Sequence, residues 1–373
     1  MAMTPERELA LGLAEGRAAT PKEIARVAEE VGDEAARWAF TQWALRERGC
    51  AKFGRARQML FTREGLEMAT HERVAAFHAE LLTDEGCPIP LGSGLLDATC
   101  GIGADTVALA RQGQTTACDL DPEHAALTLH NLAVHGLLAD VQVTDCLTLD
   151  WSDKAVFVDP QRRTGRGRTL DPQSFSPPFD AVVAKCRTAR RAVVKMSPML
   201  PDEVLEQGDG LDFVSHGGEC CEALMLFGFS HGRRAYQVET ESWIDASPLA
   251  STLDDPLGYV FEADPAAIRT HALGEFGLAG LGDSNGYLTG FEPVGSPWLA
   301  SFRVLWHGAF REDKIREATR ELGLVVRAVK KRGVDIDPEK LRKKLAGQGK
   351  RPAVAILYKV GKSVRAVLAE RIP

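Results

Sequence analysis

The sequence predicts an α/β protein, with a parallel sheet preceded by a helical region and followed by a small, basic α/β domain. From residue 89 onward, short apolar runs alternate with amphipathic segments, which is the pattern of strands joined by right-handed crossover helices. Before that point, apolar residues recur at helical spacing and convincing strands are absent. The chain of 373 residues also exceeds what one core usually accommodates, so several domains are expected.

The helical region contains recognisable helix starts. Thr20 precedes Pro21, an arrangement typical of the first turn of a helix. Asp33 is placed to cap a second helix over residues 34–48. A further helix is expected over residues 70–82.

The sheet region shows strand and helix signals in regular alternation. The last two expected strands lie close together along the chain, which suits an antiparallel edge of the sheet. The expected strands cover residues 94–100, 115–121, 139–146, 154–160, 191–197, 211–216 and 222–230, and the expected helices cover residues 104–113 and 122–136.

The rest of the chain has mixed signals and then a compact pattern. Residues 236–243 and 258–264 look extended, and residues 264–276 look helical. The final segment is expected to contain strands over 301–308, 353–360 and 363–370 and helices over 311–323 and 337–347. We therefore expect a helical domain over residues 1–88, a Rossmann-like domain over 89–232, a mixed connecting region over 233–301 and a basic domain over 302–373.

Composition narrows the class of protein. No run of about 18 apolar residues exists, and the first residues lack a secretion signal, so a cytoplasmic protein is expected. The eight cysteines form no CxxC pair and no zinc spacing, so we expect neither metal nor disulfides. The net charge is −7, but residues 302–373 carry 19 Lys and Arg against 8 Asp and Glu. A basic tail on an acidic body indicates either nucleic-acid binding or simply a well-solvated domain.

A glycine turn follows the first expected strand, in the order Asp97, Ala98, Thr99, Cys100, Gly101, Ile102, Gly103. Such a turn can hold a dinucleotide at the start of a helix. However, Thr106 replaces the third glycine of that motif. Asp97 would also repel a pyrophosphate, whereas it suits a ligand with an amino group and a sulfonium, such as S-adenosylmethionine.

Two further acids end the next two strands. Asp119, followed by Leu120, can accept hydrogen bonds from both ribose hydroxyls of that ligand. Asp145 can accept from the adenine amine, with Cys146 nearby. A single acid of this kind is usually a surface turn residue or a helix cap, but three acids ending successive strands beside a glycine turn indicate a ligand site.

The fourth strand ends in FVDPQRRTGRGR. Asp159 and the carbonyl of Pro160 can accept hydrogens from an acceptor amine, and Arg162 can stack on a base. Covalent chemistry on a pyrimidine would need a cysteine after the next strand, where Met196 and Ser197 stand instead. Cys186, earlier in the chain, is a weaker candidate, so direct transfer to nitrogen is expected. The arginines that would hold phosphates, unless they pair with acids of the body, are Arg163, Arg166 and Arg168.

The stretches DATCGIGADT, CDLDP and VFVDPQRR resemble class I S-adenosylmethionine methyltransferases. The loop is similar to that of trimethylguanosine synthase-like enzymes, as is the upstream stretch LFTREGLEMATHERVAAFHA. The resemblance implies that Phe61, Thr62 and Thr70 lie near the methionine end of the donor.

The stretches VVKMSPML, FVSHGGECCEA and KKRGVDIDPEKLRKKL extend the resemblance to bacterial methyltransferases with a C-terminal THUMP-like domain. In that family Ala is usual where Gln161 stands. THUMP domains of RNA-modifying enzymes bind RNA, often tRNA. The resemblance thus implies an RNA-binding face made of Lys330, Lys331, Arg332, Arg342, Lys343 and Lys344.

We therefore expect an S-adenosylmethionine-dependent methyltransferase acting on a base nitrogen, a purine nitrogen in the first instance, of tRNA or another structured RNA. His216 and Glu219 are further candidates on the acceptor side. Two alternatives stay open: a methyltransferase for proteins or small molecules, and an RNA-binding adaptor with a vestigial donor site.

Overall fold

The computed structural model describes residues 3–83, 94–161, 163–164, 167–168, 171–283 and 286–372. By backbone proximity the chain forms two compact units. The first unit is Met1–Gly210 with Leu224–His231, and the second is Leu211–Ala223 with Gly232–Pro373. Among the described residues, none of the helices combines the length and the apolar character that a membrane span requires.

The helical region matches the expected pattern, with one correction. Thr20 caps α2 by accepting from the Glu23 N–H, as predicted. Asp33 is not a cap: Gly32, with a φ of 80°, takes that position and Asp33 is the first helical residue. The helices of this region are α1 (Pro5–Ala14), α2 (Pro21–Val31), α3 (Asp33–Gly49), α4 (Arg63–Met68) and α5 (Glu72–Thr83).

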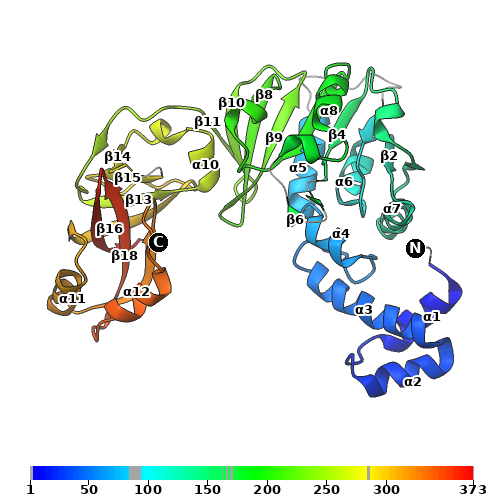
Figure 1. Cartoon of the computed structure of the whole chain (residues 1–373), viewed down its shortest axis with the longest axis horizontal. Helices are drawn as coiled ribbons and strands as arrows, with labels where there is room; N and C mark the ends of the chain where they lie inside the picture. The colour runs from blue at the N-terminus through cyan, green and yellow to red at the C-terminus, as the bar shows by residue number, and fades with distance from the viewer. Residues whose placement is uncertain are drawn as a thin grey trace. The chain divides into compact units, whose positions relative to one another are not determined.

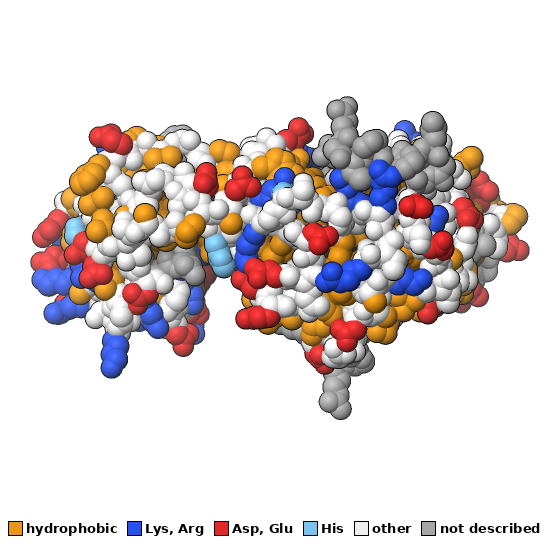
Figure 2. Space-filling view, turned by 90° about the horizontal axis from the view of Figure 1, so that it is seen from above, with side chains coloured by type: hydrophobic (Ala, Val, Ile, Leu, Met, Phe, Trp, Pro, Cys, Tyr) orange, Lys and Arg blue, Asp and Glu red, His pale blue; other side chains and the backbone are white. Residues whose placement is uncertain are grey.

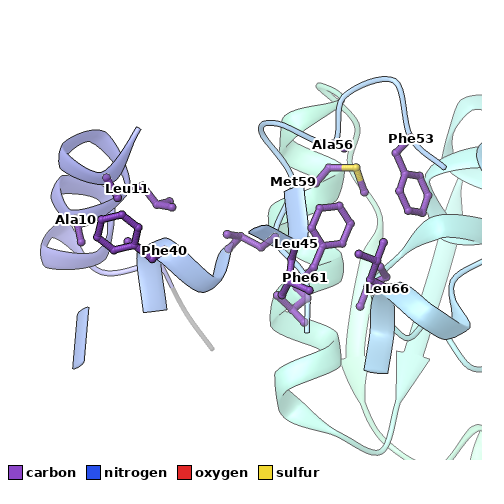
Figure 3. Packing of buried hydrophobic residues seen from close by; sticks show 14 of the residues in the cluster. Ala10, Leu11, Phe40, Leu45, Phe53, Ala56, Met59, Phe61 and Leu66 are labelled. Atoms are coloured by element: carbon purple, nitrogen blue, oxygen red, sulfur yellow. The ribbon is translucent and has the colours of Figure 1, made fainter. Parts of the chain in front are cut away.

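One hydrophobic core runs through this region into the sheet domain. Figure 3 shows Ala10, Leu11 and Phe40 packed together, while Met59 and Phe61 lie in a second group beyond Leu45. Ile102, Ala104 and Leu127 of the following domain belong to the same cluster. The early helices are therefore packed onto the glycine turn through shared apolar contacts.

The first sheet has the strand order β11-β10-β8-β9-β7-β4-β1-β2-β3 (Figure 1). Strands β7, β4, β1, β2 and β3 pair in parallel. Because the order reverses direction between β1 and β4, right-handed crossovers place α6 and α7 on one face and α8 on the other. The elements are β1 (Leu95–Asp97), α6 (Ala104–Gln112), β2 (Thr115–Asp119), α7 (Pro122–Val134), β3 (Asp140–Val143), β4 (Ala155–Val158), α8 (Phe179–Cys186), β7 (Arg191–Met196), α9 (Asp202–Leu205), β8 (Gly210–His216), β9 (Glu219–Phe227), β10 (Arg233–Gln237) and β11 (Ser242–Asp245).

Two expectations for this sheet were wrong in detail. The hairpin of β8 and β9 is not the edge, because β10 and β11 continue the sheet beyond β8. The single extended segment expected over residues 236–243 is divided by a turn, in which Glu241 has a φ of 52°.

The second sheet has the order β12-β14-β15-β13-β16-β19-β18-β17. Strands of the predicted connecting region therefore pair in the same sheet as those of the final segment. Helices α11 and α12 cover one face, where Ile315, Leu341 and Leu345 are buried. Its elements are β12 (Thr252–Leu253), β13 (Tyr259–Ala263), α10 (Pro265–Arg269), β14 (Ala279–Leu281), β15 (Tyr287–Gly290), β16 (Leu299–Ala309), α11 (Glu312–Glu321), β17 (Leu324–Lys331), α12 (Pro338–Leu345), β18 (Arg351–Val360) and β19 (Ser363–Arg371).

Candidate active site

The carboxyl ends of β4, β1, β2 and β3 lie along one edge of the first sheet, since these neighbours are parallel. Asp97 is the last residue of β1, and Asp119 is the last residue of β2. Asp159 directly follows β4, and Asp145 follows β3. The structure therefore brings the predicted aspartates to the edge where ligands of such sheets bind.

The turn between β1 and α6 is shaped by its glycines. Gly101 and Gly103 have φ values of 52° and 86°, which favour glycine. The Gly101 N–H donates to Asp119 Oδ2 at 3.0 Å, and its carbonyl accepts from the Thr128 hydroxyl at 3.0 Å. A side chain at Gly101 would meet no described atom within 4 Å, so the described residues leave room for a ligand beside this backbone.

Helix α4 lies directly on this turn. A Cβ atom at Gly65 would lie 2.4 Å from Cγ2 of the buried Ile102, so the contact requires glycine. Thr62 caps the helix by accepting from the Gly65 N–H at 2.9 Å, and Phe61 is buried before it. The end of the helix is fixed by Lys52 Nζ, which donates to the carbonyl oxygens of Leu66, Glu67 and Ala69.

Asp97 lies beneath the turn and is fully buried. Its carboxylate accepts from the Thr106 hydroxyl at 2.6 Å and from the Thr99 N–H at 3.3 Å. Burial first, and then the nearby Asp105, raises its pKa to about 7. Asp97 thus supports the turn from within the protein, and Thr106, which breaks the dinucleotide motif, is its hydrogen-bond donor.

Asp119 and Leu120 lie at the open end of β2. Burial raises the pKa of Asp119, but the nearby His124 and the backbone N–H groups of Asp121 and Gly101 outweigh it and lower that pKa. His124 Nδ1 lies 3.3 Å from Asp119 Oδ2. Leu120 is 63% exposed, which leaves an apolar surface beside an ionised carboxylate.

Asp145 and Cys146 lie beyond β3. Asp145 Oδ1 accepts from the Leu147 N–H at 2.9 Å and caps a short 3₁₀ turn. The Cys146 thiol is buried, which raises its pKa to about 12. The Cys146 carbonyl accepts from Trp151 Nε1 at 2.9 Å, so this residue anchors the loop.

Asp159 is tied to the glycine turn. Its backbone N–H donates to the Thr99 hydroxyl at 2.7 Å, and its side chain is 27% exposed. Pro160 is buried, and Gln161 is exposed and bridges to Ser176 through two backbone hydrogen bonds. The Asp159 carboxylate, predicted to contact the methyl acceptor, is therefore partly exposed, and its backbone is held by hydrogen bonds on both sides.

The arginines that were predicted to contact the base and the phosphates lie partly outside the described residues. Arg162 and Arg166 belong to the positions that the structure does not describe. The backbone at Arg163 and Arg168 forms the small hairpin of β5 (Arg163–Thr164) and β6 (Gly167–Arg168).

Sequence reasoning missed Lys195, which joins Thr70 to Asp159, and the pair of Asp105 and His78 behind Thr70. Lys195 Nζ lies 2.7 Å from Asp159 Oδ2 and 3.1 Å from Thr70 Oγ1. The Thr70 hydroxyl donates to Asp105 Oδ2 at 2.8 Å, and Asp105 Oδ1 lies 2.7 Å from His78 Nδ1. Burial would raise the pKa of Asp105, but the hydrogen bond from His78 and other donors lower it. The detectable signal was Lys195 itself, a lysine inside the apolar run VVKMS.

The expected RNA-binding face of the second unit is largely ion-paired. Lys330 and Arg332 pair with Glu262. Figure 2 likewise shows Lys and Arg side chains interspersed with Asp and Glu side chains on the face in view. The partners of Arg342 and Lys344 are Glu339, at 3.0 Å, and Glu312, at 2.9 Å.

Lys331 and Lys343 differ from these residues. Both are exposed, and neither has an ion pair with a residue that the structure describes. Also in the second unit, His216 Nδ1 lies 2.7 Å from Glu239 Oε1, while Glu219 is exposed.

Comparison with known proteins supplies the family. Residues 93–200 match the family model of RNA cap guanine-N2 methyltransferases, and residues 299–371 match that of THUMP domain-like proteins. Proteins from two strains of Mycobacterium tuberculosis, each described as an uncharacterized S-adenosylmethionine-dependent methyltransferase, are 30% identical over 349 residues, which is 88% of this chain and 94% of theirs. The chain belongs to the S-adenosylmethionine-dependent methyltransferases.

The solved structure of a protein from Porphyromonas gingivalis W83, proposed to be a methyltransferase, shares the fold. It aligns with a TM-score of 0.72 at 18% identity, over 100% of this chain and 99% of that chain. The predicted class I methyltransferase fold and the THUMP-like resemblance are thereby confirmed.

S-adenosylmethionine is the methyl donor of this methyltransferase, as predicted. The residues at the carboxyl edge fit it: a positive-φ glycine with room beside it, an ionised carboxylate at Asp119 and the exposed Leu120. In the described ranges, no group of three or more His, Cys, Asp and Glu side chains is arranged to hold a metal ion.

Proposed function

We propose that this methyltransferase modifies a base nitrogen in structured RNA, with tRNA as the first candidate. The main support is Asp159, whose carboxylate is partly exposed and whose backbone N–H donates to the Thr99 hydroxyl of the glycine turn. The model matched by residues 93–200 names an RNA base nitrogen as its target. The THUMP-like match at residues 299–371 supports an RNA partner.

On the donor side we propose direct contacts from the exposed residues of the edge. Asp119 accepts from the ribose hydroxyls, Leu120 packs against the adenine, and Asp145 accepts from the adenine amine. The backbone of Gly101 and Gly103 approaches the methionine part. We propose that the buried residues Thr70, Asp97, Ile102 and Cys146 and the half-buried Thr99 hold this surface from beneath.

S-adenosylmethionine supplies a methyl group on a positively charged sulfur, and its carbon–sulfur bond breaks with the electron pair left on sulfur. Because the displacement is in line, positioning of the acceptor supplies most of the catalysis. Asp159 and the Pro160 carbonyl accept N–H hydrogen bonds from the acceptor amine, which turns its lone pair toward the methyl carbon. The nitrogen forms the new bond with that lone pair and releases one proton to Asp159 or to water.

A base with N–H donors on neighbouring positions suits this site. A carboxylate and a carbonyl only accept hydrogen bonds, so together they complement an amino group and an adjacent ring N–H. We propose that Arg162 stacks on that base and that Arg163, Arg166 and Arg168 contact phosphates. In the second unit the free lysines Lys331 and Lys343 extend the contact with RNA.

The function is tested with methyl-labelled S-adenosylmethionine and three acceptors: total tRNA, ribosomal RNA and RNA-free cell protein. We expect one methylated nucleoside, identified by mass spectrometry, and no label in protein. Asp159→Ala is expected to bind the donor normally and to lose turnover. Label only in protein would support the alternative acceptor class. Donor calorimetry without measurable heat would support the RNA-binding adaptor.

A further inference from the structure

We propose that Lys195 is a positioning residue for Asp159, and that Thr70, Asp105 and His78 hold Lys195 in place. The proposal rests on the acceptor role of Asp159 given above. It extends the catalytic apparatus from the carboxyl edge of the sheet into helix α5 and the segment that precedes it.

Lys195 and Asp159 meet between neighbouring strands. Lys195 lies in β7 and Asp159 directly after β4, and these strands are parallel, with Val158 paired to Val194. The side chains of Lys195 and Asp159 are only 11% and 27% exposed, and Nζ lies 2.7 Å from Oδ2. This partly buried ion pair favours one orientation of the Asp159 carboxylate. Loss of the lysine would leave the carboxylate without a compensating positive charge.

The hydrogen bonds around Lys195 Nζ have a fixed direction. A lysine ammonium can only donate, so the Thr70 hydroxyl accepts from Lys195 and gives its own hydrogen to Asp105. Thr70 is 6% exposed and Asp105 is 8% exposed. The ammonium is therefore directed by a buried hydroxyl whose orientation is itself fixed.

The contacts behind Thr70 lead back to β4. Asp105 Oδ1 pairs with His78 Nδ1 at 2.7 Å, and His78 is fully buried in α5. The His78 ring stacks on Phe157 with centroids 4.7 Å apart. Phe157 lies in β4, two residues before Asp159, so the same carboxylate is supported through its side chain and through its strand.

The two carboxylate oxygens of Asp159 therefore have different roles. Oδ2 is held by Lys195, and no residue in the described part of the chain hydrogen-bonds Oδ1. Oδ1 is therefore the oxygen that faces the N–H of the acceptor. A rotated carboxylate would hold the acceptor nitrogen off line with the transferable methyl group.

The test measures kcat, KM and donor affinity on the acceptor that the wild type methylates. Lys195→Met is expected to lower kcat by about 100-fold, the effect of misplacing a reacting group by about 1 Å, with KM and donor affinity little changed. Thr70→Val should reduce kcat while Thr70→Ser, which keeps the hydroxyl, retains it. The matched control is Lys185→Met, which removes a partly buried lysine that donates to the Leu149 carbonyl and should leave kcat unchanged.

A double-mutant cycle separates positioning from general damage. If Lys195 acts through Asp159, then Asp159→Asn with Lys195→Met loses no more turnover than Asp159→Asn alone. A wild-type kcat in Lys195→Met, or multiplicative losses in the double variant, would overturn the proposal.

A measurement that needs no methyl acceptor distinguishes failure of the proposed function from failure of the role proposed for Lys195. The same cycle is run on urea unfolding, where the pair should show coupling and additive effects would overturn the role of Lys195. If the wild type methylates no RNA and the unfolding cycle still shows coupling, the proposed function fails and the contact between Lys195 and Asp159 is supported.

Discussion

The backbone N–H of Asp159 donates a 2.7 Å hydrogen bond to the hydroxyl of Thr99. Thr99 belongs to the turn after β1, and Asp159 follows β4, so one hydrogen bond joins the loop assigned to the donor to the carboxylate assigned to the acceptor. In the proposed function, the alignment of methyl carbon and acceptor nitrogen depends on this bond.

Thr99→Val removes the acceptor of that hydrogen bond while keeping the shape of the side chain. We expect kcat to fall by about tenfold, because the cost of a misplaced reacting group exceeds the roughly 1 kcal/mol of one hydrogen bond. Thr99→Ser keeps a hydroxyl and should stay near the wild type. Single-turnover rates compare the two, and equal rates would contradict the coupling.

Gly65→Ala should separate α4 from the glycine turn. The added Cβ would lie 2.4 Å from Ile102 Cγ2 and 2.7 Å from Thr62 Oγ1. We expect about 1–3 kcal/mol of lost stability, as for other overpacked sites, together with weaker donor binding. Urea unfolding and donor calorimetry measure these effects.

The matched substitution Gly12→Ala lies in α1, where an added Cβ meets no described atom within 4 Å. Alanine in a helix interior should raise the free energy of unfolding by about 0.5–1 kcal/mol there. Similar losses at both glycines would show that the contact between Gly65 and Ile102 is unimportant.

Asp97→Asn should change the pH dependence of stability. Burial raises the pKa of Asp97 from 3.8 to about 7, so the folded protein binds a proton that the unfolded chain has lost. Stability from this group is full below its unfolded pKa and is lost as pH rises through about 7. The slope is on the order of 1 kcal/mol per pH unit at most.

Asparagine cannot ionise, so the variant should lack this slope. Urea unfolding of both proteins at pH 5, 6, 7 and 8 gives the difference directly. Parallel curves would mean that Asp97 stays ionised in the folded protein.

Replacing Lys331 and Lys343 together by alanine should weaken RNA binding. Each lysine that meets a phosphate contributes roughly 1 to the slope of log affinity against log salt, so the slope should become shallower. Arg342→Ala with Lys344→Ala should change it less, since Glu339 and Glu312 already hold those charges. Binding to total tRNA at several salt concentrations makes the comparison.

The edge of the sheet was predictable because alternating strand and helix signals indicate parallel strands, whose carboxyl ends share one edge. Asp119, Asp145 and Asp159 each follow an apolar run, and parallel pairing brings such positions together. The burial of Asp97 was not predictable, since it depends on Thr106 and on the packing of helices against the turn.

The residues behind Asp159 escaped prediction for a related reason. His78, Asp105 and Lys195 are far apart in the sequence and meet only after α5 docks beside α6. Local rules failed at Asp33 because Gly32, with its positive φ, already ends α2 and begins α3.

The clamp formed by Lys52 on the end of α4 sets a limit on dissecting this enzyme. A truncated fragment that begins at β1 would contain every strand-end aspartate, yet it would uncover Ile102 and omit Thr70. Such a fragment would lack helix α4, which packs on the glycine turn, and the Thr70 hydroxyl, which accepts from Lys195. The shortest active version of the chain must therefore start upstream of Lys52.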